Sequence, residues 1–203
     1  MPWRRIFFVA NSTRKQSSME QQIILMRHGQ PQLAVTSRVA LGDMRGWIED
    51  YDRSVITQDP APAASVQLAA GAQVIACSSA PRALSSAQAL GLEPVVVDAV
   101  FCEAQLPGGR GRLAKLSPFT WAAVLRVLWL CGYSAGVESA KAAGARADEG
   151  ARRLQSIAER GPVLLVGHGL MNRLIGKRLR AAGWVRQVSG DSGYWSAVVY
   201  RRG

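Results

Sequence analysis

The two histidines of the chain, His28 and His168, each stand before a glycine, directly after an apolar run typical of a buried strand. One run covers residues 22–26 and the other covers residues 162–166. In α/β proteins with parallel sheets, ligands bind outside the carboxyl ends of the strands. A single histidine so placed would more often be an ordinary core or surface residue, but both histidines share this position. We therefore expect the two imidazoles at one edge of one sheet.

Two arginines are expected at the same edge. Arg27 directly precedes His28, and Arg82 lies in the segment CSSAPRALSSA, which follows the apolar run 73–77. Guanidinium groups bind phosphate oxygens through paired hydrogen bonds, and a helix that starts near Gly169 or Leu170 would add backbone N–H donors. The cluster predicts a phosphoryl site. Neighbouring cations lower the pKa of an imidazole, so a neutral histidine could attack phosphorus with its lone pair.

A leaving alkoxide needs a proton, so a carboxyl group is expected near the two histidines. Glu103 is the best candidate, because it follows a possible strand at 94–101 and precedes a glycine-rich loop. Four other carboxylates stay open as alternatives: Asp98, Asp43, Glu49 and Asp50. The histidines lack the local spacing of metal ligands and have arginine neighbours, so we expect no metal and no cofactor.

The elements that must position these residues alternate along the chain. Predicted strands cover 22–26, 73–77, 162–166 and 194–200, with the possible fifth at 94–101. Predicted helices cover 81–90, 119–133, 138–160 and 170–182, and the DPAPAAS stretch near Pro60 is expected to be a loop. Strands that alternate with helices indicate an α/β fold with a largely parallel sheet.

Composition limits the class of protein. A chain of 203 residues with 48% hydrophobic residues favours one domain, expected at 22–203 after a flexible extension at 1–21. The formal net charge of +11 favours anionic partners. Three cysteines without a CxxC pair indicate a reducing compartment, so we expect a cytoplasmic protein. The apolar run 119–133 is short and contains Arg126, so no membrane span is expected.

The chain resembles the histidine phosphatase superfamily, the phosphoglycerate mutase-like enzymes, over residues 23–200. Three segments carry this resemblance: RHG at 27–29, GHG at 167–169 and the arginine segment between them. In CSSAPRALSSA, Cys77 and Ser78 take the family's serine positions, and Ser86 replaces its threonine. The resemblance implies a three-layer sandwich, in which helices cover both faces of a largely parallel central sheet.

The resemblance also implies roles for individual residues. His28 would become the phosphohistidine, while Arg27, Arg82 and His168 would hold the phosphoryl group and Glu103 would donate the proton. Four further residues are expected to line the pocket: Gly29, Gln30, Gly169 and Leu170.

The expected activity is that of a cofactor-independent phosphatase acting on a small phosphomonoester, or on a phosphoprotein. The family's asparagine soon after RHG is absent, as is its tryptophan-glutamate-glycine after the acid, and both departures argue against a mutase. A phosphohistidine-protein phosphatase, a mutase-type phosphotransferase and a non-catalytic basic module that binds anions or nucleic acid stay open as alternatives. The last alternative depends on a basic helix face with Arg173, Lys177 and Arg180, and we expect no nucleic-acid partner.

The segment between the acid and His168 is where the family often caps its site. Here it carries Arg110, Arg112 and Lys115 beside Trp121 and Trp129. We favour the interpretation that both tryptophans pack in the core, because aromatic side chains are usually buried there. The alternative is a lid over an ester with an apolar or aromatic body.

Overall fold

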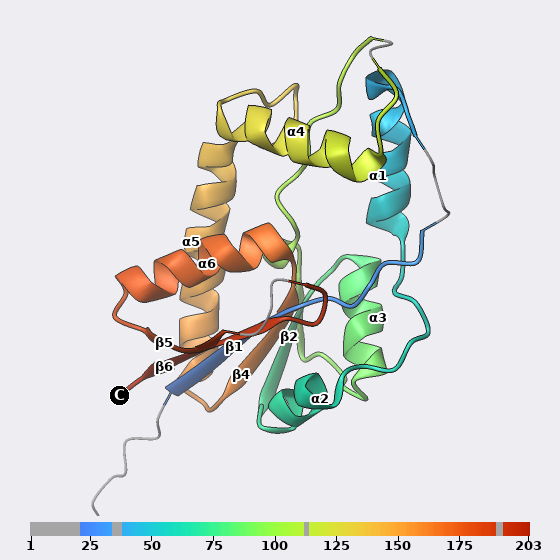
Figure 1. Ribbon diagram of the computed structural model, residues 1–203. Helices are drawn as coiled ribbons and strands as arrows, with labels where there is room; N and C mark the ends of the chain where they lie inside the picture. The colour runs from blue at the N-terminus through green and yellow to red at the C-terminus, as the bar shows by residue number, and fades with distance from the viewer. Residues whose placement is uncertain (1–20, 34–37, 112–113, 190–192) are drawn as a thin grey trace, which may run out of the picture.

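The computed structural model describes residues 21–33, 38–111, 114–189 and 193–203, and its centre is one six-stranded sheet (Figure 1). The strand order is β3-β2-β4-β1-β6-β5. The strands are β1 (Gln21–Arg27), β2 (Val74–Ser78), β3 (Val96–Asp98), β4 (Val163–Gly167), β5 (Val185–Ser189) and β6 (Ala197–Arg202). The pairs β1·β4, β2·β4 and β2·β3 are parallel, and β6 runs antiparallel to β1 and β5. The predicted α/β fold with a mostly parallel sheet is confirmed.

Helices cover both faces of the sheet, as the three-layer prediction requires (Figure 1). The helices are α1 (Met44–Arg53), α2 (Ala63–Ala70), α3 (Pro81–Ala89), α4 (Pro118–Leu130), α5 (Ala140–Ala158) and α6 (Gly169–Ala181). Successive side chains of a strand point to opposite faces. Ile23 and Leu25 therefore pack in the core beneath α5 and α6, while Ile24 and Met26 pack in the core beneath α2 and α3.

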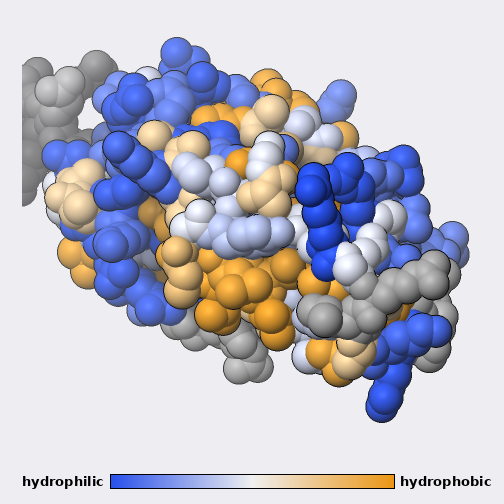
Figure 2. Space-filling view, turned by 90° about the horizontal axis from the view of Figure 1, so that it is seen from above, coloured by the Kyte–Doolittle hydropathy of each residue, from blue (hydrophilic) through white to orange (hydrophobic). Residues whose placement is uncertain are grey.

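Helix α4 lies above the sheet edge, beside α1 (Figure 1). It begins at a Ser117 cap, whose hydroxyl accepts the Thr120 N–H at 3.1 Å. Trp121 and Trp129 are 7% and 1% exposed, so the favoured core interpretation of both tryptophans is confirmed. The outer face of the helix is nevertheless apolar, and Figure 2 shows this surface from above. Its exposed residues are Val124, Val127, Leu128 and Leu130.

Several segments differ from the predictions. The stretch near Pro60 is a loop only as far as Pro62, since α2 begins at Ala63. The possible strand 94–101 is shorter, because Asp98 accepts the Val100 N–H at 2.8 Å and turns the chain into the short 3-10 helix η2 (Ala99–Phe101). A second 3-10 helix, η1 (Leu41–Asp43), leads into α1. Neither α1 nor the edge strand β5 was predicted.

The structure addresses three other predictions only in part: the N-terminal extension, the cytoplasmic location and the membrane span. Residues 1–20 of the expected extension lie outside the described residues, and Gln21 already belongs to β1. Cys77, Cys102 and Cys131 are free thiols, and the cytoplasmic location stays a prediction. Within the described part of the chain, no helix is both long and apolar enough to cross a membrane.

Candidate active site

The register of the central strands brings the two histidines together. Arg27 at the end of β1 pairs with Gly167 at the end of β4, and the His28 N–H donates to the Gly167 carbonyl at 3.0 Å. The residue after each strand end is a histidine, so the ring centroids of His28 and His168 lie only 5.1 Å apart. The predicted juxtaposition of these two imidazoles is therefore present.

The hydrogen bond made by His28 indicates which of its nitrogens can react. Its Nδ1 lies 2.7 Å from the carbonyl oxygen of Gly29. Because a carbonyl can only accept, Nδ1 carries the hydrogen and the lone pair of the neutral ring is on Nε2. Burial is the main reason that the pKa of His28 falls to about 3, and Arg82 and Arg27 lower it further. The two arginines, which the sequence indicates as the cause of this shift, are therefore smaller contributors than burial.

His168 is fully buried at the N-cap of α6. Its Nε2 lies 2.8 Å from the hydroxyl oxygen of Ser78, which itself accepts the Ala80 N–H at 3.2 Å. The serine hydrogen can therefore go to Nε2, which leaves the imidazole hydrogen on Nδ1. Burial, and then Arg82 and the other nearby cations, hold the pKa of His168 well below its usual value.

Each arginine of the cluster lies against a tyrosine that sequence reasoning missed. The Arg82 guanidinium is 4.7 Å from the ring centroid of Tyr51, and that of Arg27 is 4.5 Å from the ring centroid of Tyr194. Helix α1 holds Arg82 further, since its guanidinium donates to the Tyr51 carbonyl at 3.2 Å and lies 3.3 Å from the Asp52 carboxylate. Both cations are thereby fixed in orientation beside the histidines.

Glu103 lies at the start of α6. Its Oε1 accepts the N–H groups of Ala104 and Met171 at 3.0 and 2.9 Å, and its Oε2 accepts that of Leu170 at 3.0 Å. A carboxylate at a helix N-terminus satisfies N–H groups that have no partner within the helix. These bonds place Glu103 beside His168, which is the residue just before the same helix.

Two arginines hold the backbone of the Glu103 segment. Arg146 on α5 donates to the carbonyls of Val100, Cys102 and Glu103 at 3.0, 2.6 and 3.3 Å, and its charge is paired with Glu138 at 2.7 Å. Arg126 on α4 donates to the next two carbonyls, those of Ala104 and Gln105, at 2.7 and 3.2 Å. This irregular segment is therefore fixed by side chains rather than by strand pairing.

The alternative carboxylates lie elsewhere. Asp98 caps η2 and pairs with Arg153, Asp50 pairs with Arg53, and Asp43 and Glu49 are exposed. In the described part of the chain, the carboxylates that line the site cavity are Glu103 and Asp52. Asp52 was missed in the sequence, where an acidic residue in a polar helix carries no distinguishing signal.

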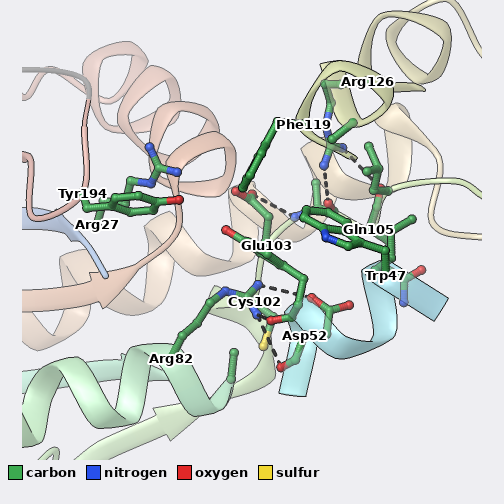
Figure 3. A pocket seen from close by; sticks show the side chains of 16 residues that line it. Arg27, Trp47, Asp52, Arg82, Cys102, Glu103, Gln105, Phe119, Arg126 and Tyr194 are labelled. Carbon is green, nitrogen blue, oxygen red and sulfur yellow. Dashed lines mark hydrogen bonds and ion pairs between the residues drawn. The ribbon is translucent and has the colours of Figure 1, made fainter. Parts of the chain in front are cut away.

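A cavity of about 420 Å³ opens over these residues (Figure 3). Its floor includes the charged residues Arg27, Arg82 and Glu103 and the phenol of Tyr194, while α1 and α4 supply the walls. His28 is 2% exposed and His168 is fully buried, so both lie behind this lining rather than on it. Among the described residues, no group of three or more His, Cys, Asp or Glu is arranged to hold a metal ion.

The residues expected to line the pocket are not among the cavity walls of the described structure. Gly29 lies under Trp195, whose Cζ2 would be 2.5 Å from a Cβ atom at that position, and its N–H donates to Ser86 Oγ at 2.9 Å. Leu170 packs against the hydrophobic core. Gln30 is exposed, and a Cβ atom at Gly169 would lie 3.5 Å from Arg27 Nε.

A family model described as histidine phosphatase superfamily (branch 1) matches residues 23–202. The chain belongs to the histidine phosphatase superfamily. This confirms the family that the RHG and GHG segments indicated. Sequence comparison with curated proteins finds no match to this superfamily member.

Solved structures share the superfamily fold at low sequence identity. The Rv3214 protein of Mycobacterium tuberculosis is 20% identical, with a TM-score of 0.55 over 78% of this chain and 79% of that chain. A mutant phosphoserine phosphatase from Entamoeba histolytica, solved in complex with phosphoserine, is 14% identical, with a TM-score of 0.57 over 88% and 89%. The TTHB049 protein of Thermus thermophilus is 22% identical, with a TM-score of 0.51 over 88% and 92%.

We expect both histidines of this superfamily member to stay neutral in the folded protein at mildly acidic pH. The lowered pKa values predict that the Hε1 resonances of His28 and His168 show no transition between about pH 4.5 and pH 8. NMR titration, with each resonance assigned by single His→Gln variants, measures this directly. A midpoint near the usual histidine pKa of about 6.5 for either ring would contradict the buried, neutral pair.

The same pKa shifts imply that the protein loses stability in acid. The unfolded chain binds protons at both histidines as pH falls below about 6.5, while folded His28 stays neutral down to about pH 3. His28 should therefore lower the free energy of unfolding by about 2 kcal/mol between pH 7 and pH 5, and His168 should act in the same direction. Urea unfolding at both pH values, compared with that of the His28→Gln variant, measures the contribution of His28.

Proposed function

We propose that the protein is a phosphatase that hydrolyses a phosphomonoester through a phosphohistidine intermediate on His28, without a cofactor. The observation that carries this proposal is the bond from Nδ1 of His28 to the Gly29 carbonyl, in a buried ring whose pKa is about 3. This bond fixes the lone pair on Nε2 in a ring that stays neutral at physiological pH. Nucleophilic attack on phosphorus needs such a nitrogen.

The phosphoryl group would be held by Arg27, Arg82, His168 and the N-terminus of α6. Two buried atoms there, Nε of Arg82 and Nδ1 of His168, make no hydrogen bond with the described residues. Buried polar atoms normally have a partner, and phosphoryl oxygens would supply one to each. The fixed positive charges also stabilise the charge on the equatorial oxygens in the transition state.

In the first step, Nε2 of His28 attacks phosphorus and the bond from phosphorus to the ester oxygen breaks. The departing oxygen takes a proton from the Glu103 carboxyl group, so a neutral alcohol leaves and Glu103 becomes a carboxylate. His28 is 2% exposed, so side chains of the cavity floor must shift before phosphorus reaches Nε2.

In the second step, water attacks the phosphorus of phosphohistidine while the Glu103 carboxylate takes a proton from that water. The bond from phosphorus to Nε2 breaks, inorganic phosphate leaves, and both His28 and the Glu103 carboxyl group return to their starting states. No electron transfer is involved, and each proton released is taken up again.

The proposal is tested by measuring phosphate release from a panel of phosphomonoesters in EDTA, together with rapid acid and alkaline quenching of labelled enzyme. We expect turnover in EDTA and a phosphoenzyme that is stable in alkali and labile in acid, the behaviour of a phosphoramidate. A phosphoenzyme with the opposite stability, or turnover that EDTA stops, would overturn the phosphohistidine route.

A further inference from the structure

A row of three aromatic rings extends from Arg82 along one side of the cavity, and Figure 3 labels two of them, Trp47 and Phe119. Arg82 lies 4.7 Å from the ring centroid of Tyr51, and Tyr51 stacks on Trp47 with centroids 5.4 Å apart and ring planes at 27°. Trp47 in turn meets Phe119 edge-on, with centroids 5.4 Å apart and ring planes at 80°. We call Tyr51, Trp47 and Phe119 the aromatic wall. It comes from α1 and α4, which are far apart in sequence.

The rest of the cavity lining combines apolar side chains with polar ones, which include Asp52, Gln105 and Arg126. Ile48, Leu106 and Ala122 line the cavity next to the aromatic wall. Phe119 lines the cavity and is 58% exposed, so part of its ring is accessible to a ligand. A concave apolar surface that ends at a few fixed charges is the usual form of a small-molecule site, in which the charges orient the ligand and the apolar walls bind its body.

We propose that the aromatic wall binds the leaving group, so that the substrate is a phosphomonoester of a flat, apolar alcohol or phenol. This inference rests on the proposed function for the position of the phosphoryl group, which Arg27 and Arg82 would fix at the inner end of the cavity. The ester body then extends over Tyr51 toward Trp47 and Phe119. A sugar or amino-acid body would place hydroxyl or charged groups against these apolar faces and lose their hydration.

Two substrates separate the contribution of the wall from the reactivity of the ester. 2-Phenylethyl phosphate and ethyl phosphate both release a primary alcohol and differ by one phenyl ring. We expect kcat/KM to be at least about 10-fold higher for the phenylethyl ester, mainly through a lower KM, because apolar pocket contacts favour the larger body. Equal kcat/KM values would overturn the proposal.

Variants of the aromatic wall test whether these residues cause the preference for 2-phenylethyl phosphate over ethyl phosphate. Phe119→Ala should reduce the preference for 2-phenylethyl phosphate to less than about 3-fold, mainly by lowering kcat/KM for that ester. Trp47→Leu, a second variant from the other helix, should act in the same direction. Val127→Ala is the matched control, because Val127 is also on α4, is 59% exposed and does not line the cavity. A preference that survives in both wall variants would refute this assignment.

A binding measurement distinguishes failure of the proposed phosphatase activity from failure of the proposal that the aromatic wall binds the leaving group. If wild type hydrolyses neither ester, calorimetry measures the binding of both esters to wild type and to Phe119→Ala. Tighter binding of 2-phenylethyl phosphate, lost in Phe119→Ala, would support the wall and refute hydrolysis. Equal binding of the two esters, or binding of neither, would overturn the wall as well.

Discussion

Replacement of His28 by asparagine is expected to lower kcat at least about 1000-fold and to leave no trapped phosphoenzyme. Asparagine removes the nucleophilic nitrogen, but its amide N–H can still donate to the Gly29 carbonyl that now lies 2.7 Å from Nδ1. The local backbone should therefore be preserved. Phosphate release and alkali-quenched labelling with the same ester provide the two measurements.

The control for this variant is Gln30→Asn, two residues along the same loop. The Gln30 side chain is exposed, and its backbone carbonyl accepts the Thr57 N–H at 2.8 Å, a bond that the substitution keeps. Its kcat should stay within about 2-fold of wild type, as expected for a surface substitution away from the reacting atoms. If the His28→Asn variant still forms a labelled phosphoenzyme, another residue is the nucleophile.

The sequence predicts the histidine cluster because this part of the site depends only on strand ends. Strands β1 and β4 are buried on both faces, so they are continuous apolar runs whose ends can be located in the sequence. Once two neighbouring parallel strands are located, the residues that follow them must lie side by side. The proximity of His28 and His168 could therefore be predicted from the strand ends. The same reasoning placed Arg82 after the end of another strand, at the start of its helix.

The cavity walls could not be predicted in this way. Helix α1 contains Met44 as its one fully buried residue among those described. Trp47 and Tyr51 line the cavity, and Trp47 also packs against the core cluster around Met44. Its apolar residues Met44, Trp47, Ile48 and Tyr51 follow the spacing of an amphipathic helix, but that spacing does not show which of them line a cavity. The contact of Asp52 and Tyr51 with Arg82 joins segments about 30 residues apart, and only the fold brings them together.

For Glu103, the sequence indicates the residue but not the contacts that position it. Its position after a predicted strand made Glu103 a candidate, yet β3 ends at Asp98 and Glu103 follows η2 and an irregular stretch. The position of its carboxyl group is set by Arg146, Arg126 and the N-terminus of α6, which lie far from it in sequence. Sequence reasoning could therefore propose the residue but not the contacts that hold it.

Replacement of Glu103 by glutamine is expected to lower kcat about 100- to 1000-fold for 2-phenylethyl phosphate, whose alkoxide needs a proton. The decrease should be less than about 10-fold for p-nitrophenyl phosphate, whose leaving group is a stable anion. Among the described residues, Oε2 of Glu103 accepts one hydrogen bond, from Leu170, so its second lone-pair site can carry the proton. Steady-state kinetics with both esters measure the difference.

Asp52→Asn is the matched variant, because Asp52 is the other carboxylate among the described residues that line the cavity. Its side chain is 62% exposed and lies 3.3 Å from the Arg82 guanidinium, so its replacement should lower kcat less than about 10-fold for either ester. If instead Asp52→Asn shows the dependence on leaving group and Glu103→Gln does not, Asp52 is the proton donor. An equal loss for both esters in Glu103→Gln would mean that Glu103 acts only by holding the N-terminus of α6, because a purely structural role slows good and poor leaving groups alike.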